Sequence, residues 1–184
     1  MDEKRIAKAF EEILEAIGEN RNREGLEETP IRVAKSYQEL FSGIGQDPRK
    51  VLQRTFNVKK NDYIIEKQID FYSMCEHHFL PFFGKIDIAY IPNGKILGFG
   101  DLLKLVDILS KRPQIQERLT EEIATYLYEE LRCQGVFVRV KAKHLCMTMR
   151  GEKKENTEII TVSSNGVFEM DSQKRFEVLQ LLNS

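Results

Sequence analysis

The chain has 184 residues, of which 28 are Lys or Arg and 29 are Asp or Glu, so its formal net charge is −1. This length suits one domain with a sizeable hydrophobic core. A nearly neutral chain has no global field to attract nucleic acid or anionic lipid, and no apolar run is long enough to span a bilayer, so we expect neither nucleic acid nor membrane as a partner. An odd count of three cysteines makes a poor disulfide framework and favours reduced thiols in the cytoplasm.

The N-terminal part of the chain is predicted to be helical. Apolar residues recur at helical spacing over 3–17, and a glycine follows as a stop signal. Thr29-Pro30 is an N-cap followed by proline at the first helical position, and it begins a second amphipathic helix. Asp47-Pro48 begins a third, shorter helix in the same way.

A charged break at 59–62 precedes a different pattern, so we expect a helical segment over 1–62 and a second domain over 63–184. Beyond the break, four stretches alternate with a period near two, two have helical spacing, and the residues at the C-terminus are again helical in pattern. This order of helices, then β-β-α-α-β-β, then a closing helix predicts an α+β chain with antiparallel hairpins. The strand-like stretches are 63–71, 85–90, 136–142 and 158–162, and the helical ones are 102–109, 115–127 and the residues from about 172 onward.

All three histidines and two of the three cysteines fall in two short segments, Cys-Glu-His-His at 75–78 and His-Leu-Cys at 144–146. Cys and neutral His are the side chains that zinc binds best. Segments this far apart in sequence build one site only if the fold brings them together, so the pattern predicts both a metal and a tertiary contact.

Cys75, His78 and Cys146 are plausible ligands, which leaves a fourth position for water as at a catalytic zinc. His77 or His144 could also close the site with a fourth protein ligand, as at a structural zinc. The ligand count alone leaves both arrangements open. If they are not ligands, these two histidines are the candidates for proton transfer.

Six motifs carry a resemblance to a known family. They are Arg23-Glu24-Gly25-Leu26, Thr29-Pro30-x-Arg32-Val33-Ala34, Met74-Cys75-Glu76-His77-His78-Phe79-Leu80-Pro81-Phe82, Ala89-Tyr90-Ile91-Pro92, Gln114-x-Gln116-Glu117-Arg118-Leu119-Thr120 and His144-x-Cys146-Met147-Thr148-Met149-Arg150-Gly151. With these motifs the chain resembles the GTP cyclohydrolase I family over nearly its whole length. Members of that family convert GTP to dihydroneopterin triphosphate.

The resemblance implies the tunnelling fold, an antiparallel β-β-α-α-β-β sheet with helices on one face, for a catalytic domain over 63–184. It also implies a homo-oligomer in which sheets join edge to edge into pentameric barrels, two barrels form a decamer, and active sites lie between subunits.

The resemblance further implies a role for each site residue. Cys75, His78 and Cys146 would bind zinc, which would present an activated water to C8 of guanine and open the imidazole ring, with formate released by a second hydrolysis. His77 and His144 match the proton-transfer histidines of the family.

Substrate binding is implied for a second group of residues. Glu117 matches the carboxylate that receives the guanine N1–H and 2-amino group, and Gln116 sits beside it in the pocket. Arg150 matches a residue that grips the triphosphate, where a planar guanidinium is well suited. Without the resemblance, Glu117 and Arg118 would be interpreted as part of a solvated helix face.

One segment departs from the family pattern. The family has glycine, an apolar residue, serine and lysine there, with an arginine three positions after the lysine, and these polar residues hold the triphosphate. Here Gly100 and Asp101 replace the serine and lysine, and Lys104 replaces the arginine. Asp101 turns an attractive charge into a repulsive one, and Lys104 keeps its charge but lacks the bidentate fork.

Three functions are compatible with this departure. The chain is an ordinary GTP cyclohydrolase I that binds triphosphate through Arg150 and Lys104, or a divergent relative that acts on a less phosphorylated purine, or an enzyme whose product stops short of the final rearrangement. A non-enzymatic zinc-stabilised oligomer is the alternative from another class. A nucleic-acid module, prompted by Arg139, Lys141 and Lys143, is disfavoured because these residues alternate with apolar ones as on a solvated strand face.

Overall fold

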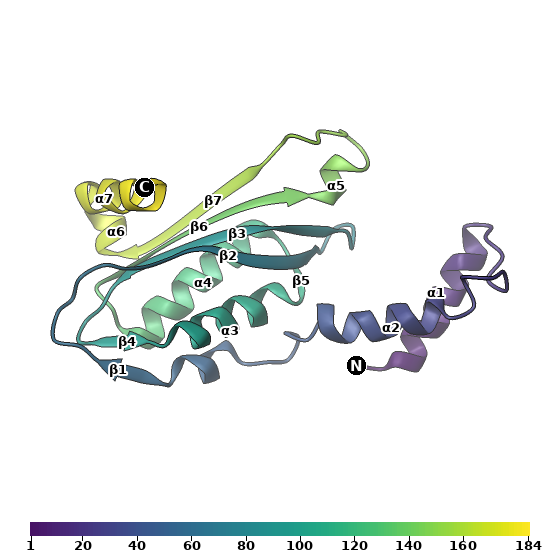
Figure 1. Ribbon diagram of the computed structural model, residues 1–184, viewed down its shortest axis with the longest axis horizontal. Helices are drawn as coiled ribbons and strands as arrows, with labels where there is room; N and C mark the ends of the chain where they lie inside the picture. Colours follow the sequence, from purple (N-terminus) through teal and green to yellow (C-terminus); the bar gives the residue numbers. More distant parts are fainter. The chain divides into compact units, whose positions relative to one another are not determined.

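A computed structural model describes residues 1–184, which divide into two compact units, Met1–Ser42 and Gly43–Ser184 (Figure 1). The 3₁₀ helix η1, Pro48–Leu52, packs on α3 and α4 within the larger unit. The predicted domain boundary after residue 62 stays a prediction.

The smaller unit is a helical hairpin of α1, Glu3–Ala16, and α2, Thr29–Leu40. The side chain of Asp2 caps α1 by accepting a hydrogen bond from the Arg5 backbone N–H, and Gly18 follows the helix with φ of 85°. The prediction that Thr29 caps α2 is wrong by one residue, because Glu28 occupies the cap position. The Thr29 hydroxyl instead donates to the Gly25 carbonyl at 3.2 Å, inside the turn that enters the helix.

A five-stranded sheet in the order β5-β2-β3-β6-β7 organises the larger unit (Figure 1). The pairs β2–β3, β3–β6 and β6–β7 are antiparallel, as the sequence predicted, and only the short β5 runs parallel to its neighbour. A second, two-stranded sheet joins β1 to β4. The bounds are β1 Thr55–Asn57, β2 Ile64–Cys75, β3 Pro81–Ile91, β4 Lys95–Leu97, β5 Pro113–Gln114, β6 Gly135–His144 and β7 Ile159–Gly166.

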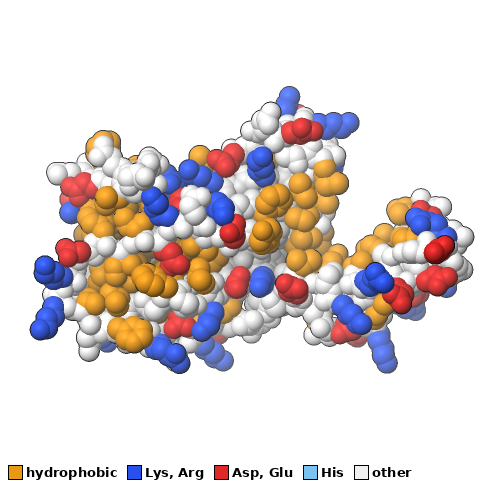
Figure 2. Space-filling model, in the orientation of Figure 1, with side chains coloured by type: hydrophobic (Ala, Val, Ile, Leu, Met, Phe, Trp, Pro, Cys, Tyr) orange, Lys and Arg blue, Asp and Glu red, His pale blue; other side chains and the backbone are white.

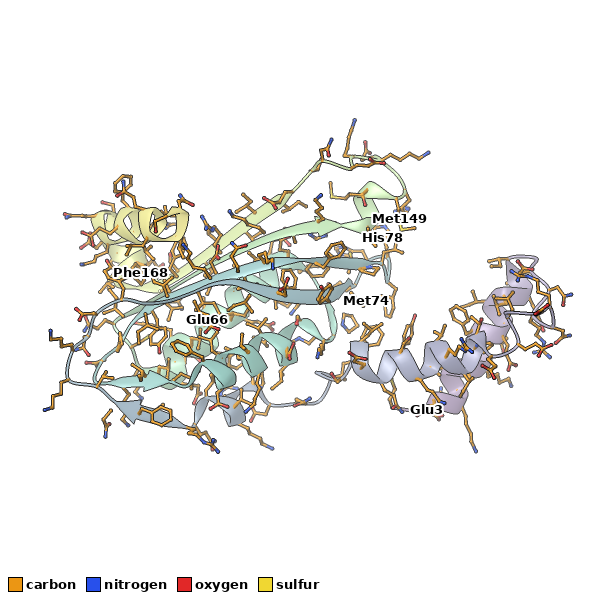
Figure 3. All side chains as sticks on the ribbon, in the orientation of Figure 1. Glu3, Glu66, Met74, His78, Met149 and Phe168 are labelled. Carbon is orange, nitrogen blue, oxygen red and sulfur yellow. The ribbon has the colours of Figure 1, made fainter.

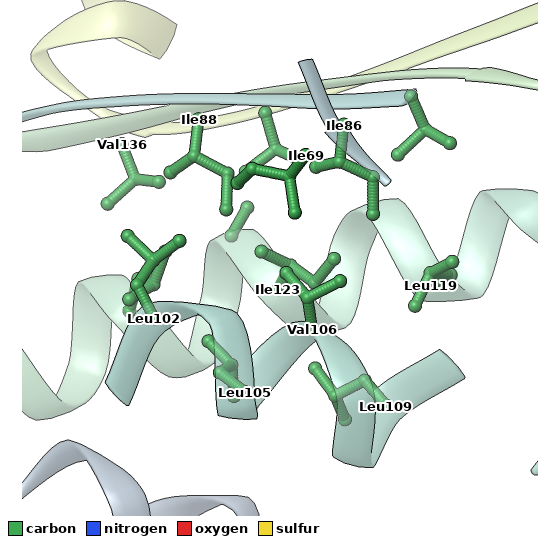
Figure 4. Packing of buried hydrophobic residues seen from close by; sticks show 14 of the residues in the cluster. Ile69, Ile86, Ile88, Leu102, Leu105, Val106, Leu109, Leu119, Ile123 and Val136 are labelled. Atoms are coloured by element: carbon green, nitrogen blue, oxygen red, sulfur yellow. The ribbon is translucent and has the colours of Figure 1, made fainter. Parts of the chain in front are cut away.

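Helices α3, Phe99–Ser110, and α4, Gln116–Leu131, cover one face of this sheet (Figures 1 and 4). Alternate residues of β3, such as Ile86 and Ile88, point from the sheet into the layer between it and the helices, where they meet Leu105 and Ile123. Each such fully buried side chain contributes about 1.5–3 kcal/mol relative to an exposed one, so this layer is the main source of stability. The predicted α+β arrangement with the two principal helices on one face is confirmed. No helix is both long and apolar enough to cross a membrane.

The opposite face is covered at one end by α6, Val167–Met170, and α7, Ser172–Asn183 (Figure 1). Arg139 of β6 lies beneath α7 and pairs with Asp87, the two nitrogens Nε and Nη2 lying 2.9 and 2.8 Å from the same carboxylate oxygen. Nη1 of Arg139 also donates to Asn183. The expectation of a solvated strand face is therefore wrong for Arg139, which is 6% exposed, because the closing helix packs over it.

Acidic and basic side chains are interspersed over the surface in view in Figure 2. This mixture agrees with the near-zero net charge of the sequence. It offers no broad patch of one sign on that face.

Candidate metal centre and active site

Three potential metal ligands meet at one end of the sheet. Cys75 is the last residue of β2, His78 lies in the turn between β2 and β3, and Cys146 lies in the short helix α5, Leu145–Thr148, that follows β6. One ligand atom from each, two sulfurs and a ring nitrogen, all lie within 4.8 Å of one another. Figure 3 shows His78 at this end of the sheet, beside α5.

Strand register brings the two segments together. β2 pairs with β3 so that Met74 faces Pro81, and β3 pairs with β6 so that Phe82 faces His144. The ends of β2 and β6 therefore lie on either side of the start of β3. The predicted contact between the two histidine–cysteine segments is a direct consequence of this register.

The turn that carries His78 is held by backbone hydrogen bonds. The Phe79 N–H donates to the Cys75 carbonyl at 2.8 Å, and the Cys75 N–H donates to the Leu80 carbonyl at 2.9 Å. The Glu76 N–H donates to the Gln114 carbonyl of β5 at 3.1 Å, which anchors the turn to the neighbouring edge. These bonds fix the conformation of the turn that presents His78.

The two thiols are electrostatically suited to a cation. Burial raises the pKa of the Cys146 thiol, and the adjacent Cys75 raises it further, while the charge of Arg150 lowers it. Two thiolates side by side repel, and a divalent ion between them removes that cost. The donor set of two sulfurs and one imidazole therefore fits a metal ion, whereas the third thiol, Cys133, is buried on its own and has its pKa raised to about 11.

His144 stands beside this cluster in a fixed orientation. Its ring stacks on Phe82, with centroids 4.7 Å apart and planes at 10°. Its Nε2 lies 2.8 Å from Oε1 of Gln116. Burial lowers the pKa of His144, and the charge of Glu117 acts weakly in the opposite direction. The other histidine, His77, has its Nδ1 at 4.0 Å from the sulfur of Cys75.

The first residues of α4 divide between interior and surface. Gln116 is 1% exposed and makes all its side-chain contacts inside the protein, to β6 and β7. Glu117 is exposed and lines a cleft of about 570 Å³ together with Glu121 and polar residues of β7 such as Thr161 and Ser163. Of these two neighbouring residues, only Glu117 presents its side chain to the cleft.

An ion pair that no local sequence pattern indicates ties α4 to the turn that carries His78. Arg118 donates from Nη1 to one carboxylate oxygen of Glu76 at 2.6 Å and from Nη2 to the other at 3.0 Å. Nη1 also lies 3.2 Å from Oε1 of Gln114. Both partners belong to motifs shared with the family, but 42 residues separate them, and no spacing rule pairs them.

The divergent segment forms a separate pocket. Nζ of Lys104 lies 2.7 Å from Asp101, and this hydrogen bond lowers the pKa of the Asp101 carboxyl. Both residues line a pocket of about 390 Å³ with Lys50 and Arg54, and its lining shares no residue with the cleft at Glu117. Within one chain, Lys104 is thus placed with a cluster of cations and not with the predicted guanine-binding residue.

Fold and site together define an α+β protein with a candidate metal centre flanked by histidines. Residues 6–183 match the family model of GTP cyclohydrolase I. The chain belongs to the GTP cyclohydrolase I family.

Two relatives match the chain over nearly its full length. The chain is 64% identical over 182 residues to GTP cyclohydrolase 1 of Fusobacterium nucleatum subsp. nucleatum, which covers 99% of this chain and 97% of that protein. It is also 49% identical over 183 residues to GTP cyclohydrolase 1 of Clostridium perfringens (strain 13 / Type A). That match covers 100% of this chain and 99% of the Clostridium protein. Among solved structures, the archaeosine synthase QueF-Like in the apo form matches 59% of this chain and 97% of that chain, with a TM-score of 0.45 and 18% identity.

Proposed function

We propose that this chain is a GTP cyclohydrolase I, a hydrolase that opens the imidazole ring of guanine in GTP and yields 7,8-dihydroneopterin triphosphate and formate. The observation that carries the proposal is the convergence of Cys75, His78 and Cys146 on one point. Full-length identity of 64% to a protein named GTP cyclohydrolase 1 supports it.

The proposed metal is zinc. Two sulfurs and one imidazole nitrogen form a donor set that zinc favours, and three protein ligands leave one coordination position open. When bound, zinc supplies Lewis-acid chemistry and a more acidic water. The residues that would hold it are Cys75, His78 and Cys146.

Proton transfer is assigned to His77 and His144. Breaking a C–N bond of the purine requires a proton on the departing nitrogen, and an imidazole can deliver and recover one. Both side chains adjoin the ligand cluster: His77 lies between two of its members in sequence, and His144 precedes Cys146 by two residues. The stacking of His144 on Phe82 limits its motion and suits a directed transfer.

Guanine recognition is assigned to Glu117, with Gln116 beside it. Guanine presents the N1–H and the 2-amino group side by side, and a carboxylate offers two acceptors at matching spacing. The exposed position of Glu117 in a cleft supports this role. Arg150 and Lys104 are assigned to the triphosphate.

We further propose a homodecamer of two pentamers, with active sites between subunits, in the cytoplasm. β7 is an edge strand whose Ile160 and Val162 are 55% and 45% exposed, and an open apolar edge favours pairing with another chain. The separate locations of Glu117 and Lys104 within one chain are compatible with a site completed by a neighbouring subunit.

The proposed location in the cytoplasm follows from the thiols. A reducing compartment suits a site that depends on two free thiols.

The alternative is a relative that acts on a less phosphorylated purine. The observation that favours it is the Asp101–Lys104 ion pair, which engages the cation at the position where the family has a phosphate-binding arginine. A panel of GTP, GDP, GMP and guanosine, incubated with zinc-loaded protein, separates the two functions by formate release and the absorbance of the pterin product. Turnover of GTP above the others supports GTP cyclohydrolase I activity, turnover of GMP or guanosine above GTP supports the alternative, and no formate from any of them supports a non-catalytic zinc-stabilised oligomer.

A further inference from the structure

The amide of Gln116 can adopt only one orientation. Nε2 lies 3.1 Å from the carbonyl oxygen of Val140 and 3.0 Å from that of Ile159. Backbone carbonyls only accept hydrogen bonds, so the NH₂ group must face them and Oε1 must face the other way. The atom that Oε1 meets there is Nε2 of His144, at 2.8 Å.

Two threonines complete this network without changing the orientation. The Thr120 hydroxyl donates to the Gln116 backbone carbonyl at 2.7 Å, so it receives its own hydrogen bond from Thr161, whose oxygen lies 2.6 Å away. The Thr161 oxygen then accepts from Nε2 of Gln116, at 3.1 Å. The two amide hydrogens are shared among the three acceptors near Nε2, and the two backbone carbonyls among them suffice to keep the NH₂ group on that side.

This network decides which nitrogen of His144 carries a proton. Oε1 of an amide only accepts, so Nε2 of His144 must donate and therefore holds the hydrogen. A neutral imidazole has one N–H, which leaves Nδ1 with its lone pair. The stacking on Phe82 fixes the ring plane, so the direction of that lone pair is fixed as well.

We propose that Gln116 is a positioning residue that holds His144 as the Nε2–H tautomer, so that Nδ1 is the atom through which this histidine exchanges a proton with the purine. The proposal rests on the proposed function for the identity of the substrate. It differs from a role of Gln116 in contacting guanine, since the side chain is buried and both ends of its amide are engaged inside the protein. Gln116 acts through His144, as outer residues act on a metal ligand or catalytic base.

The tautomer can be measured directly in the zinc-loaded protein. Only three histidines are present, so ¹⁵N labelling of histidine gives a simple spectrum, and a His144→Asn variant assigns the signals of His144. At a pH where the ring is neutral, the proposal expects a protonated Nε2 and an unprotonated Nδ1. A protonated Nδ1 in the wild-type protein would overturn it, whatever the activity of the variants.

A variant and a matched control connect the tautomer to catalysis. Gln116→Met keeps the side-chain length but removes the acceptor, so His144 should populate both tautomers, and kcat should fall by about 10- to 100-fold with KM nearly unchanged. Thr120→Val removes a hydroxyl of the same network outside the cleft at Glu117 and leaves the two carbonyls to orient the amide. It should therefore keep the Nε2–H tautomer and kcat of the wild type.

The outcomes separate this proposal from the proposed function. A KM that rises in Gln116→Met while the tautomer stays Nε2–H would assign Gln116 to substrate binding and refute the positioning role. If no purine is turned over, the proposed function fails, but the wild-type ¹⁵N spectrum still tests whether Gln116 sets the tautomer. If Gln116→Met does not fold, the wild-type ¹⁵N spectrum decides alone, because a protonated Nδ1 there overturns the proposal.

Discussion

The N-termini of α3 and α4 differ in how they are held. At α4, Gln116 is buried and bonded to two strands, and Arg118 reaches back to Glu76 in the turn that carries His78. At α3, the main polar contact is the Asp101–Lys104 pair, in which the Lys104 side chain is 62% exposed. The buried hydrogen bonds at α4 hold side chains within the small positional tolerance that catalysis requires. The ion pair at α3, with an exposed lysine, contributes little to stability and rearranges easily.

This difference indicates where sequence change is tolerated. A residue of the α4 network cannot change without leaving buried donors or acceptors unpaired, which is costly. A substitution at the start of α3 changes a charge near the surface, and it alters mainly the attraction for an anionic group. The departure from the family pattern falls at the start of α3. The proposed ring-opening residues, in the two histidine–cysteine segments and at the start of α4, are all present.

The largest effect is expected at the metal cluster. Cys146→Ser removes a soft ligand, so the protein should lose most of its zinc and its ring-opening rate should fall by about 1,000-fold or more. Zinc content by elemental analysis and formate release measure the two consequences. Cys133→Ser is the matched control, because this buried thiol lies outside the cluster, and it should retain both zinc and activity. Equal zinc content in the two variants would contradict the assignment.

The next effect is expected at the guanine-binding position. Glu117→Gln replaces one acceptor by a donor that faces the donors of guanine, so kcat/KM should fall by about 100-fold. Glu121→Gln removes a charge from the same cleft one turn further along α4 and should have little effect. Similar losses in both variants would show that the cleft acts through its overall charge and not through Glu117.

A smaller effect is expected where α4 is tied to the turn. Arg118→Met frees Glu76 and loosens the turn that carries His78, so we expect about a tenfold lower kcat and weaker zinc binding. Lys85→Met breaks an ion pair of similar length, with Asp70, on the open face of the sheet and serves as the control. Equal zinc affinity in the Arg118→Met and Lys85→Met variants would show that Arg118 does not position the turn.

The smallest effect is expected at α3. Asp101→Lys restores a cation next to Lys104 and Arg54, so KM for GTP should fall by about three- to tenfold with kcat little changed. Guanosine lacks the phosphates, and its KM should not respond. An unchanged KM for GTP would mean that this pocket does not bind the triphosphate.

The sequence predicted the parts of the site that depend on residue type. Cys75, His78 and Cys146 are rare side chains in two tight groups, and the alternation of the flanking strands predicted hairpins that end near one another. Both expectations rest on local pattern, and the register of β2, β3 and β6 confirms the contact.

The remaining features depend on tertiary packing, which local pattern does not encode. The pairs Arg118–Glu76 and Gln116–His144 join residues 42 and 28 positions apart, so they follow only from how α4 lies on the sheet. Arg139 was misjudged for the same reason, because its strand alternation is that of an open face and α7 covers it. The prediction of Thr29 as the cap was off by one residue, because the Thr29 hydroxyl bonds to the Gly25 carbonyl in the preceding turn.

X-ray absorption at the zinc edge distinguishes an open from a closed site, because it counts the ligands of the bound ion. For the zinc-loaded protein we expect two sulfur scatterers at about 2.3 Å, one imidazole nitrogen at about 2.0–2.1 Å and one further light atom that is not part of a second imidazole. Two imidazoles with two sulfurs would mean a site closed by His77 or His144. That result would contradict an open catalytic position and would favour a structural metal.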